Sequence, residues 1–252
     1  MYSIKKNPEI KLNIPKFNCD ENAVGEHLNY HPLTKFLNVY AFTTIIGRPG
    51  FGKTSLAISL ITQKNPKIYR KTHHHIIVMM PQNSIESLAV NPFKKLPEEN
   101  IYNELNDSTI TSVYNKIDSF SKDNEKTILF IDDCTASLKS TAHIQETLKK
   151  LIYNRRHLKL NIIITVQSFC NLPLDIRKNI QNMILYKPSK KEFELIFDEL
   201  FELKKTIAAD IMKIAYTEKH NFLFMNVPSQ RLFKNWDEII IKDPDDENII
   251  EP

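Results

Sequence analysis

The sequence predicts an α/β sandwich built around a mainly parallel sheet. Five short apolar runs, rich in β-branched residues, alternate with segments in which apolar residues recur at helical spacing. A glycine-rich connection at residues 47–54 joins the first run to the first helical segment. Buried strands that alternate with helices are typical of parallel sheets covered on both faces.

The first half of the chain contains two of these strands and two helices. VYAFTTIIG, residues 39–47, reads as a buried strand, and SLAISLITQK, residues 55–64, has apolar residues at helical spacing. HHIIVMMP, residues 74–81, reads as a second strand that Pro81 ends. Residues 108–121 place Ile110, Val113 and Ile117 on one helical face, which predicts an amphipathic helix.

The second half continues the alternation and ends differently. TILFIDD at 127–133, NIIITVQ at 161–167 and NMILYK at 182–187 are the remaining strands, with a helix expected at 143–157 and a short helical turn at 172–179. Two amphipathic helices are expected within 190–218. FLFMNV at 222–227 and QRLFKNW at 230–236 flank a Pro-Ser turn and predict a terminal hairpin.

Composition indicates one globular domain with short appendages. Of 252 residues 42% are apolar and 25% charged, which excludes a fibrous or wholly disordered chain. No apolar run is long enough to span a bilayer and no signal sequence is evident, so we expect an intracellular protein. Cys19, Cys134 and Cys170 form no CxxC pair, which argues against a disulfide framework or a zinc knuckle.

Charge and proline content suggest the domain limits. We predict an N-terminal arm at 1–38, an α/β domain at 39–236 and an acidic tail at 237–252. Residues 243–252 hold five acids and no base, so residues 1–242 carry 34 basic against 25 acidic side chains. Such a surplus suits a polyanionic partner or serves solubility. The tail is interpreted as a solubilising segment or as a docking strip.

Residues 47–54, GRPGFGKT, match the pattern GxxxxGK[ST] of a phosphate-binding loop between a strand and a helix. Glycines let the backbone N–H groups wrap a phosphate chain at a helix N-terminus. Lys53 would reach the β- and γ-phosphates of ATP, and the Thr54 hydroxyl would bind Mg²⁺. The nucleotide contacts expected from this segment are Gly47, Arg48, Pro49, Gly50, Phe51, Gly52, Lys53, Thr54 and Ser55.

Polar side chains follow two later strands. Asp132 and Asp133 end TILFIDD, an arrangement in which Asp132 would hold Mg²⁺ and Asp133 would orient or deprotonate the attacking water. Gln167 ends NIIITVQ, where a neutral amide could hydrogen-bond the γ-phosphate or that water. We expect these side chains to meet at the carboxyl edge of the sheet.

Two other clusters of charged or titratable residues give weaker signals. His73, His74 and His75 enter a strand and point to alternate faces, so we interpret them as a mixed strand edge rather than a metal site. A basic patch near the third helix either lines a pore for nucleic acid or solvates a helix; it consists of Lys149, Lys150, Arg155, Arg156 and Lys159.

Together, GRPGFGKT, LFIDD, the strand that ends in Gln167 and the following LPLDIRKN resemble the FtsK/HerA superfamily. The resemblance is to the poxvirus-type DNA-packaging ATPases of large DNA viruses and virophages, and it covers residues 39–227. It implies a RecA-like (ASCE) P-loop NTPase fold, a three-layer sandwich with a C-terminal hairpin. The second acid is often Glu in this superfamily, so Asp133 leaves a shorter reach to water.

The resemblance also implies an arginine finger, a side chain that completes the active site of a neighbouring subunit. FtsK-type motors carry an arginine about eleven residues before the terminal glutamine, and Arg156 matches that position in NRRHLKLNIIITVQ. Arg155 and Arg177 are rival candidates.

The implied function is an ATP-driven translocase of double-stranded DNA that packages a viral genome into the capsid. It would act as a homo-oligomeric ring, a hexamer or pentamer, with ATP and Mg²⁺ at subunit interfaces and capsid vertex or portal proteins as partners. The expected location is the host cytoplasm, a viral factory or the virion. Two alternatives stay open, a P-loop nucleoside or nucleotide kinase and an ATP-gated assembly protein that does not turn over.

Overall fold

The computed structural model describes residues 37, 40–64, 68–201, 203 and 205–241. The predicted N-terminal arm, residue 37 aside, and residues 242–252 of the acidic tail lie outside these residues. The domain limits proposed from the sequence stay predictions.

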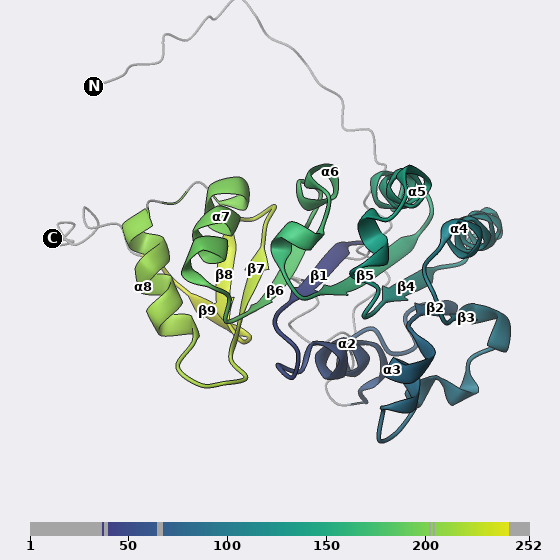
Figure 1. The fold of residues 1–252 in the computed structure, drawn as a ribbon, viewed down its shortest axis with the longest axis horizontal. Coiled ribbons are helices and arrows are strands. Elements are labelled where there is room, and N and C mark those ends of the chain that lie inside the picture. Colours follow the sequence, from purple (N-terminus) through teal and green to yellow (C-terminus); the bar gives the residue numbers. More distant parts are fainter. Residues whose placement is uncertain (1–36, 38–39, 65–67, 202, 204, 242–252) are drawn as a thin grey trace, which may run out of the picture.

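One nine-stranded sheet forms the centre of the molecule, with the strand order β3-β2-β4-β5-β1-β6-β7-β8-β9 (Figure 1). The six strands from β3 to β6 in this order run parallel, and β7, β8 and β9 continue the sheet in antiparallel pairing. Their bounds are β1 Phe42–Ile46, β2 His75–Met79, β3 Ile101–Tyr102, β4 Thr127–Ile131, β5 Leu160–Val166, β6 Asn182–Tyr186, β7 Phe222–Asn226, β8 Arg231–Lys234 and β9 Asp237–Ile239.

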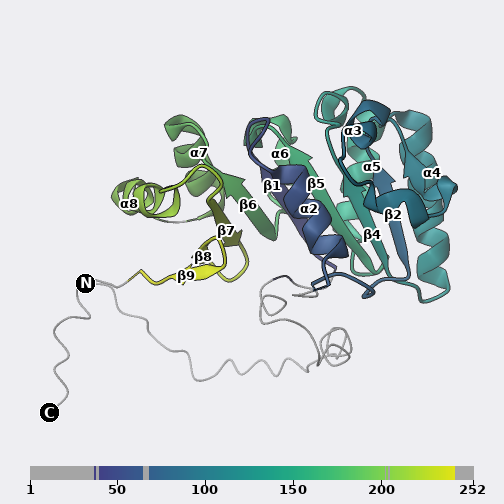
Figure 2. The same cartoon turned by 90° about the horizontal axis from the view of Figure 1, so that it is seen from below.

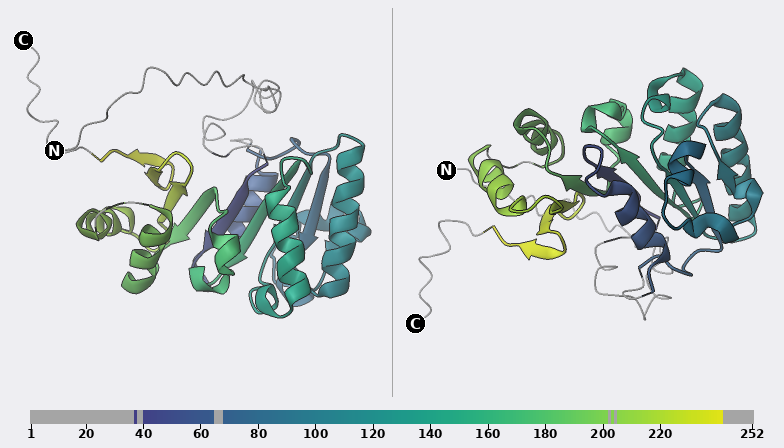
Figure 3. Two further views of the ribbon diagram at one scale, coloured as in Figure 1. Left: turned by 90° about the horizontal axis from the view of Figure 1, so that it is seen from above. Right: turned by 60° about the horizontal axis from the view of Figure 1, so that its bottom comes forward.

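Helices cover both faces of the sheet, which confirms the predicted three-layer α/β fold. Helices α2 (Lys53–Thr62) and α3 (Gln82–Glu86) lie on one face (Figure 2). The other face carries α4 (Asp107–Lys122), α5 (Ala142–Tyr153), α6 (Leu174–Arg177), α7 (Lys190–Leu200) and α8 (Lys205–Ala215) (Figure 3).

Alternating strand residues divide the core into two apolar layers. Ile162 and Ile164 of β5 face the layer of α4, α5 and α7, whereas Ile163 faces the layer of α2. This alternation follows from the two-residue repeat of a strand. The central strands are buried on both faces, as their continuous apolar runs predict.

The N-termini of three helices are capped by side chains that accept hydrogen bonds from backbone N–H groups. Asn106 forms a capping box with Thr109 at the start of α4, Thr141 caps α5, and Ser189 caps α7. These caps supply partners for N–H groups that the first helical turn leaves unpaired.

The C-terminal ends of two predicted elements differ from the sequence-based expectation. The helix predicted at 143–157 ends at Tyr153, because Asn154 leaves the helix and residues 155–159 turn into β5. The predicted C-terminal hairpin is confirmed, because β7 and β8 pair in antiparallel fashion, and β9 adds a third strand beside β8. Strand β9 therefore lies in residues that the charge pattern assigned to the start of the tail.

Candidate nucleotide-binding site

The register of the sheet brings the ends of β1, β4 and β5 together at the carboxyl edge. Ile46 of β1 pairs with Val166 of β5, so Gly47 and Gln167 follow as neighbours. Ile131 of β4 pairs with Ile164, which puts Asp132 beside Thr165. The phosphate-binding loop, both acids and Gln167 thus lie along one edge of the sheet.

The loop between β1 and α2 has the backbone geometry of an anion cradle. Gly50 and Gly52 have φ angles of 78° and 94°, a left-handed conformation that glycine adopts without strain. Gly52 is the N-cap of α2 and has no side chain to cap it, and the first turn of α2 holds no acid. The first N–H groups of the helix are therefore not occupied by a side-chain cap and can bind a phosphate.

Gly47 is needed for a different reason. A Cβ atom at this position would lie 2.8 Å from Cβ of Tyr186, the last residue of the adjacent strand β6. Tyr186 also forms an edge-on ring contact with Phe51 at 6.2 Å between centroids. Burial raises the pKa of Tyr186 to about 12, so its hydroxyl stays neutral beneath the loop.

Thr54 and Asp132 are in direct contact. The Thr54 hydroxyl lies 2.9 Å and 3.1 Å from the two carboxylate oxygens of Asp132. Thr165 donates a further hydrogen bond to the same carboxylate. Asp132 is 2% exposed, and burial raises the pKa of its carboxyl group while the two hydroxyl donors oppose that shift.

Lys53 begins α2 and is half-buried. Its Nζ donates to the carbonyl oxygen of Arg48 at 3.2 Å, across the loop. Burial lowers the pKa of the ammonium group, and the charges of Asp132 and Asp133 act in the opposite direction. A cation at the start of a helix, at the edge of a glycine-rich loop, is well placed to contact phosphate oxygens.

Asp133 leaves the strand in a left-handed conformation, with φ of 55°. Its side chain is exposed, and its Oδ2 accepts a hydrogen bond from Oγ of Ser84 at 2.8 Å. Ser84 lies on α3, which follows β2, the neighbour of β4. The contact with Ser84 was not expected from the sequence, because nothing in the segment QNSIE distinguishes it from an ordinary polar helix.

Gln167 is exposed at the end of β5 and lines a pocket next to the first residues of the loop. The pocket is formed by Ile46, Gly47, Arg48, Gln167, Ser168, Tyr186, Lys187, Pro188, Ser189 and Glu192. Gln167 therefore lies beside Gly47 and Arg48, at the carboxyl edge that the strand pattern predicts for it.

Arg156 is the one predicted site residue that lies elsewhere. It lies in the turn before β5, at the amino edge of the sheet, while Gln167 follows the same strand at the carboxyl edge. The seven residues of β5 span roughly 23 Å at about 3.3 Å each, which is beyond the reach of an arginine side chain. Arg156 cannot contact the phosphate loop of its own chain.

The two rival arginines are engaged within the fold. Arg155 is half-buried and donates to Gln181 Oε1 at 3.0 Å and to the Ile152 carbonyl at 2.8 Å. Arg177 pairs with Glu199 at 3.1 Å and lies over the ring of Phe169. Both guanidinium groups thus hold elements of their own chain together.

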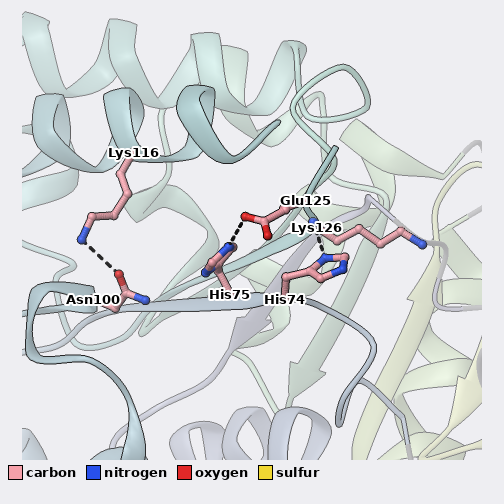
Figure 4. A network of polar contacts seen from close by, with 6 residues as sticks. All are labelled: His74, His75, Asn100, Lys116, Glu125 and Lys126. Atoms are coloured by element: carbon pink, nitrogen blue, oxygen red, sulfur yellow. Dashed lines mark hydrogen bonds and ion pairs between the residues drawn. The ribbon is translucent and has the colours of Figure 1, made fainter. Parts of the chain in front are cut away.

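The three histidines do not converge on one site, and members of the basic patch also contact different residues. His75 contacts Glu125 at 2.6 Å, and His74 accepts from the Lys126 N–H at 2.9 Å (Figure 4). His73 contacts Asn161 at 2.9 Å. In the basic patch, Lys149 pairs with Asp175 at 2.5 Å, and Lys159 contacts Asn124. Within the described residues no group of three or more His, Cys, Asp or Glu side chains could hold a metal ion.

A comparison with protein families identifies the chain. The family model for the poxvirus A32 protein matches residues 33–252. The chain belongs to the poxvirus A32 protein family. This membership confirms the resemblance to poxvirus-type packaging ATPases and the enzyme class, an ATPase. No curated protein sequence matches the chain.

Solved structures with the same fold include viral and bacterial ATPases. The genome packaging NTPase B204 from Sulfolobus turreted icosahedral virus 2, in complex with ATP-gammaS, is 20% identical, with a TM-score of 0.58 over 81% of this chain and 100% of that chain. B204 from Sulfolobus Turreted Icosahedral Virus, a DNA-packaging ATPase, is 17% identical, with a TM-score of 0.60 over 79% and 98%. EssC (ATPases 2 and 3) from Geobacillus thermodenitrificans is 12% identical, with a TM-score of 0.54 over 81% and 41%.

These likenesses confirm a fold shared with P-loop NTPases. None of the helices within the described residues has the length and apolar character that crossing a bilayer requires.

Proposed function

We propose that this A32 family protein is an ATP-driven translocase of double-stranded DNA that packages a viral genome into a capsid. The observation that carries the proposal is the contact of the Thr54 hydroxyl with the buried Asp132 carboxylate at the uncapped start of α2. Side chains from two strand ends and a helix meet there as a triphosphate site requires. The host cytoplasm, a viral factory and the virion are the proposed locations.

The residues around this contact have distinct proposed roles. Lys53 binds the β- and γ-phosphates, and the N–H groups from Gly50 to Thr54 surround the phosphate chain. Asp133 accepts a proton from the attacking water or orients it, and its hydrogen bond to Ser84 fixes the carboxylate beside the site. Gln167 binds the γ-phosphate or the water as a neutral donor.

The oxygen donors at Thr54 and Asp132 fit Mg²⁺. A hydroxyl and a buried carboxylate are hard oxygen ligands of the kind that Mg²⁺ binds together with nucleotide phosphates. Burial raises the pKa of the Asp132 carboxyl group, which means that its negative charge is costly to bury. A cation bound beside it would therefore stabilise the ionised carboxylate. Thr54 and Asp132 would hold the ion, which when bound supplies neutralisation of charge on the phosphate oxygens.

Arg156 is proposed to complete the site of a second copy. Its position at the amino edge excludes a role at its own phosphate loop, whereas a ring of head-to-tail contacts can bring it to a neighbour's carboxyl edge. There the guanidinium would stabilise the charge on the transferring phosphoryl group. A homo-oligomeric ring is the assembly that this role requires.

Duplex DNA is the proposed polyanionic partner. The basic surplus of residues 1–242 favours contacts with phosphate groups, which carry little sequence preference. Packaging must accept every sequence of a genome, so this kind of contact suits the task. Capsid vertex or portal proteins are the proposed protein partners.

The test is ATP hydrolysis measured with and without long duplex DNA, using Lys53→Ala and Asp132→Ala as inactive controls. We expect DNA to stimulate hydrolysis by the unmodified chain and neither control to hydrolyse ATP. Stimulation should weaken steeply as salt rises, because phosphate contacts release bound counterions.

The same assay separates the two alternatives. Hydrolysis that depends on an added nucleoside or nucleoside monophosphate, and not on DNA, would indicate a kinase. Tight ATP binding without turnover, together with ATP-dependent oligomerisation, would indicate an assembly protein. Either result would overturn the translocase.

A further inference from the structure

Helix α7 holds the segment that follows Gln167. Oε1 of Glu192, in the first turn of α7, accepts a hydrogen bond from Oγ of Ser168 at 2.7 Å and from the N–H of Phe169 at 2.6 Å. Ser168 and Phe169 directly follow Gln167. One carboxylate oxygen therefore fixes both residues by which the chain leaves β5.

A second contact ties the same segment to α7. The guanidinium of Arg177, on α6, lies 4.7 Å from the ring centroid of Phe169 and pairs with Glu199 at 3.1 Å. The two charged side chains are only 13% and 21% exposed, so solvent screens the pair weakly. Phe169, whose ring lies beneath the Arg177 guanidinium, is fully buried.

Both carboxylates lie on one face of α7. Glu192 and Glu199 are seven positions apart, which is close to two full turns of an α-helix. Helices α6 and α7 lie on the same face of the sheet (Figure 1). The helix thus contacts the segment after Gln167 directly through Glu192 and indirectly through Arg177.

We propose that Glu192 is a positioning residue for Gln167 and holds its amide in reach of the γ-phosphate. The inference rests on the proposed function of the site. Without these two hydrogen bonds, Ser168 and Phe169 are no longer held in one conformation. The side-chain amide of Gln167, the residue before them, then shifts as well. Because Gln167 acts only on the γ-phosphate or its water, the effect falls on turnover and on the preference for ATP over ADP, and not on ADP binding.

Variants at position 192 separate reach from charge. Glu192→Gln keeps an oxygen acceptor at the same distance and removes the charge, whereas Glu192→Asp keeps the charge and shortens the side chain. Glu192→Ala removes both. Glu194→Gln is the matched control, because Glu194 lies on the same helix, is 42% exposed and pairs only loosely with Lys190 at 3.9 Å.

We expect Glu192→Ala and Glu192→Asp to lower kcat about tenfold, as misplacement of a substrate-contacting group does, and to raise KM for ATP by about the same factor as the Kd for ATP-gammaS. Glu192→Gln and the Glu194→Gln control should stay within about twofold of the unmodified chain, by the same reasoning. Equilibrium binding of ATP-gammaS and ADP is measured in parallel. The preference for ATP-gammaS should fall in the Ala and Asp variants while the Kd for ADP stays the same.

Two outcomes would overturn the proposal. One is a Glu192→Ala chain that folds and keeps both kcat and the nucleotide preference; the other is a Glu192→Gln chain as impaired as Glu192→Ala. Should the Ala variant fail to fold, Ser168→Ala removes one of the two hydrogen bonds, and an unchanged kcat and preference in Ser168→Ala and Glu192→Asp would count against it. The binding readout needs no turnover, so a chain that never hydrolyses ATP would refute the translocase separately.

Discussion

Tyr186 gives Gly47 a role that the phosphate-loop pattern does not explain. Gly50 and Gly52 are needed for their backbone angles, but Gly47 is needed because a neighbouring strand leaves no room for a side chain. Gly47 donates its N–H to the carbonyl of Val166 at 3.1 Å, so this hydrogen bond ties it to β5. The loop is thus anchored between β5 and β6 before it wraps the phosphates.

Gly47→Ala should therefore cost more stability than Gly50→Ala. At Gly47 the added methyl meets Tyr186 and should lower the free energy of unfolding by about 2–3 kcal/mol. At Gly50 nothing lies within 4 Å of the added atom, and the strained backbone alone should cost roughly 1 kcal/mol. Urea unfolding measures both, and an equal or smaller loss for Gly47→Ala would refute the steric explanation.

Asp133 provides a test of the catalytic role. Asp133→Asn keeps the size of the side chain and removes its ability to accept a proton, so kcat should fall about 100-fold. The Kd for ATP-gammaS should stay within about threefold, because the phosphate-binding groups are untouched. Asp123→Asn, an exposed acid at the end of α4, is the control. Near-normal hydrolysis by Asp133→Asn would exclude Asp133 as the base.

Single residues of the site were predictable where a local pattern carries them. The loop, Asp132, Asp133 and Gln167 each follow a strand that the sequence marks clearly. Ser84, Thr165 and Tyr186 were not predicted, because their contacts depend on which strands are neighbours and in what register. The roles of all these residues stay predictions until they are tested.

The turn between α5 and β5 carries two adjacent arginines that differ in burial. Arg155 binds Gln181, whose Oε1 also accepts from the Phe42 N–H at 3.3 Å, and so joins α5 to the starts of β1 and β6. Burial lowers the pKa of Arg155, and the adjacent charge of Arg156 acts in the same direction. Arg156 is exposed on the same turn.

Alanine at these two positions should separate stability from hydrolysis. Arg155→Ala leaves Gln181 without its charged donor and should lower the free energy of unfolding by about 1–3 kcal/mol. Arg156→Ala, at an exposed position, should lower it by at most about 1 kcal/mol yet remove most hydrolysis in the assembled protein. Urea unfolding and steady-state kinetics test the pair. Normal hydrolysis by Arg156→Ala would remove it as the finger.

Elements were predictable when they are long or strongly patterned. The parallel strands β1, β2, β4, β5 and β6 and the helices α4, α7 and α8 lie where apolar periodicity indicates them. Helix α3 and strand β3 were missed because five and two residues are too short to show a period. Strand β9 was missed because DEI, its three residues, is mostly acidic and exposed.

For the whole assembly, mixed rings test whether sites are shared between copies. Subunits with Arg156→Ala keep their own site, and subunits with Asp133→Ala keep their arginine. In a random equal mixture about a quarter of the interfaces combine an intact site with an intact arginine, because a head-to-tail ring joins each pair of copies in one direction. Hydrolysis should recover to about that fraction, whereas each variant alone stays inactive. No recovery in a mixture that forms rings would contradict a shared site.

The arrangement of the whole sheet was only partly predictable. The alternation of strands and helices implies parallel neighbours and helices on both faces, and both were found. The order of the strands could not be predicted from local patterns, because strand pairing depends on contacts between distant segments. That β5 lies between β1 and β4, and so brings Gln167 between the loop and the acids, required the structure.

The uninterrupted sheet limits how this molecule could perform mechanical work. Strand β6 joins the nucleotide-binding strands to the antiparallel unit through backbone ladders on both sides, without a hinge between them. A pull applied at β8 or β9 would therefore reach β1 through consecutive rows of hydrogen bonds. If the protein moves DNA, each stroke would consist of a tilt of the entire subunit against its neighbours, and the elastic part of the machine would be the joints between copies.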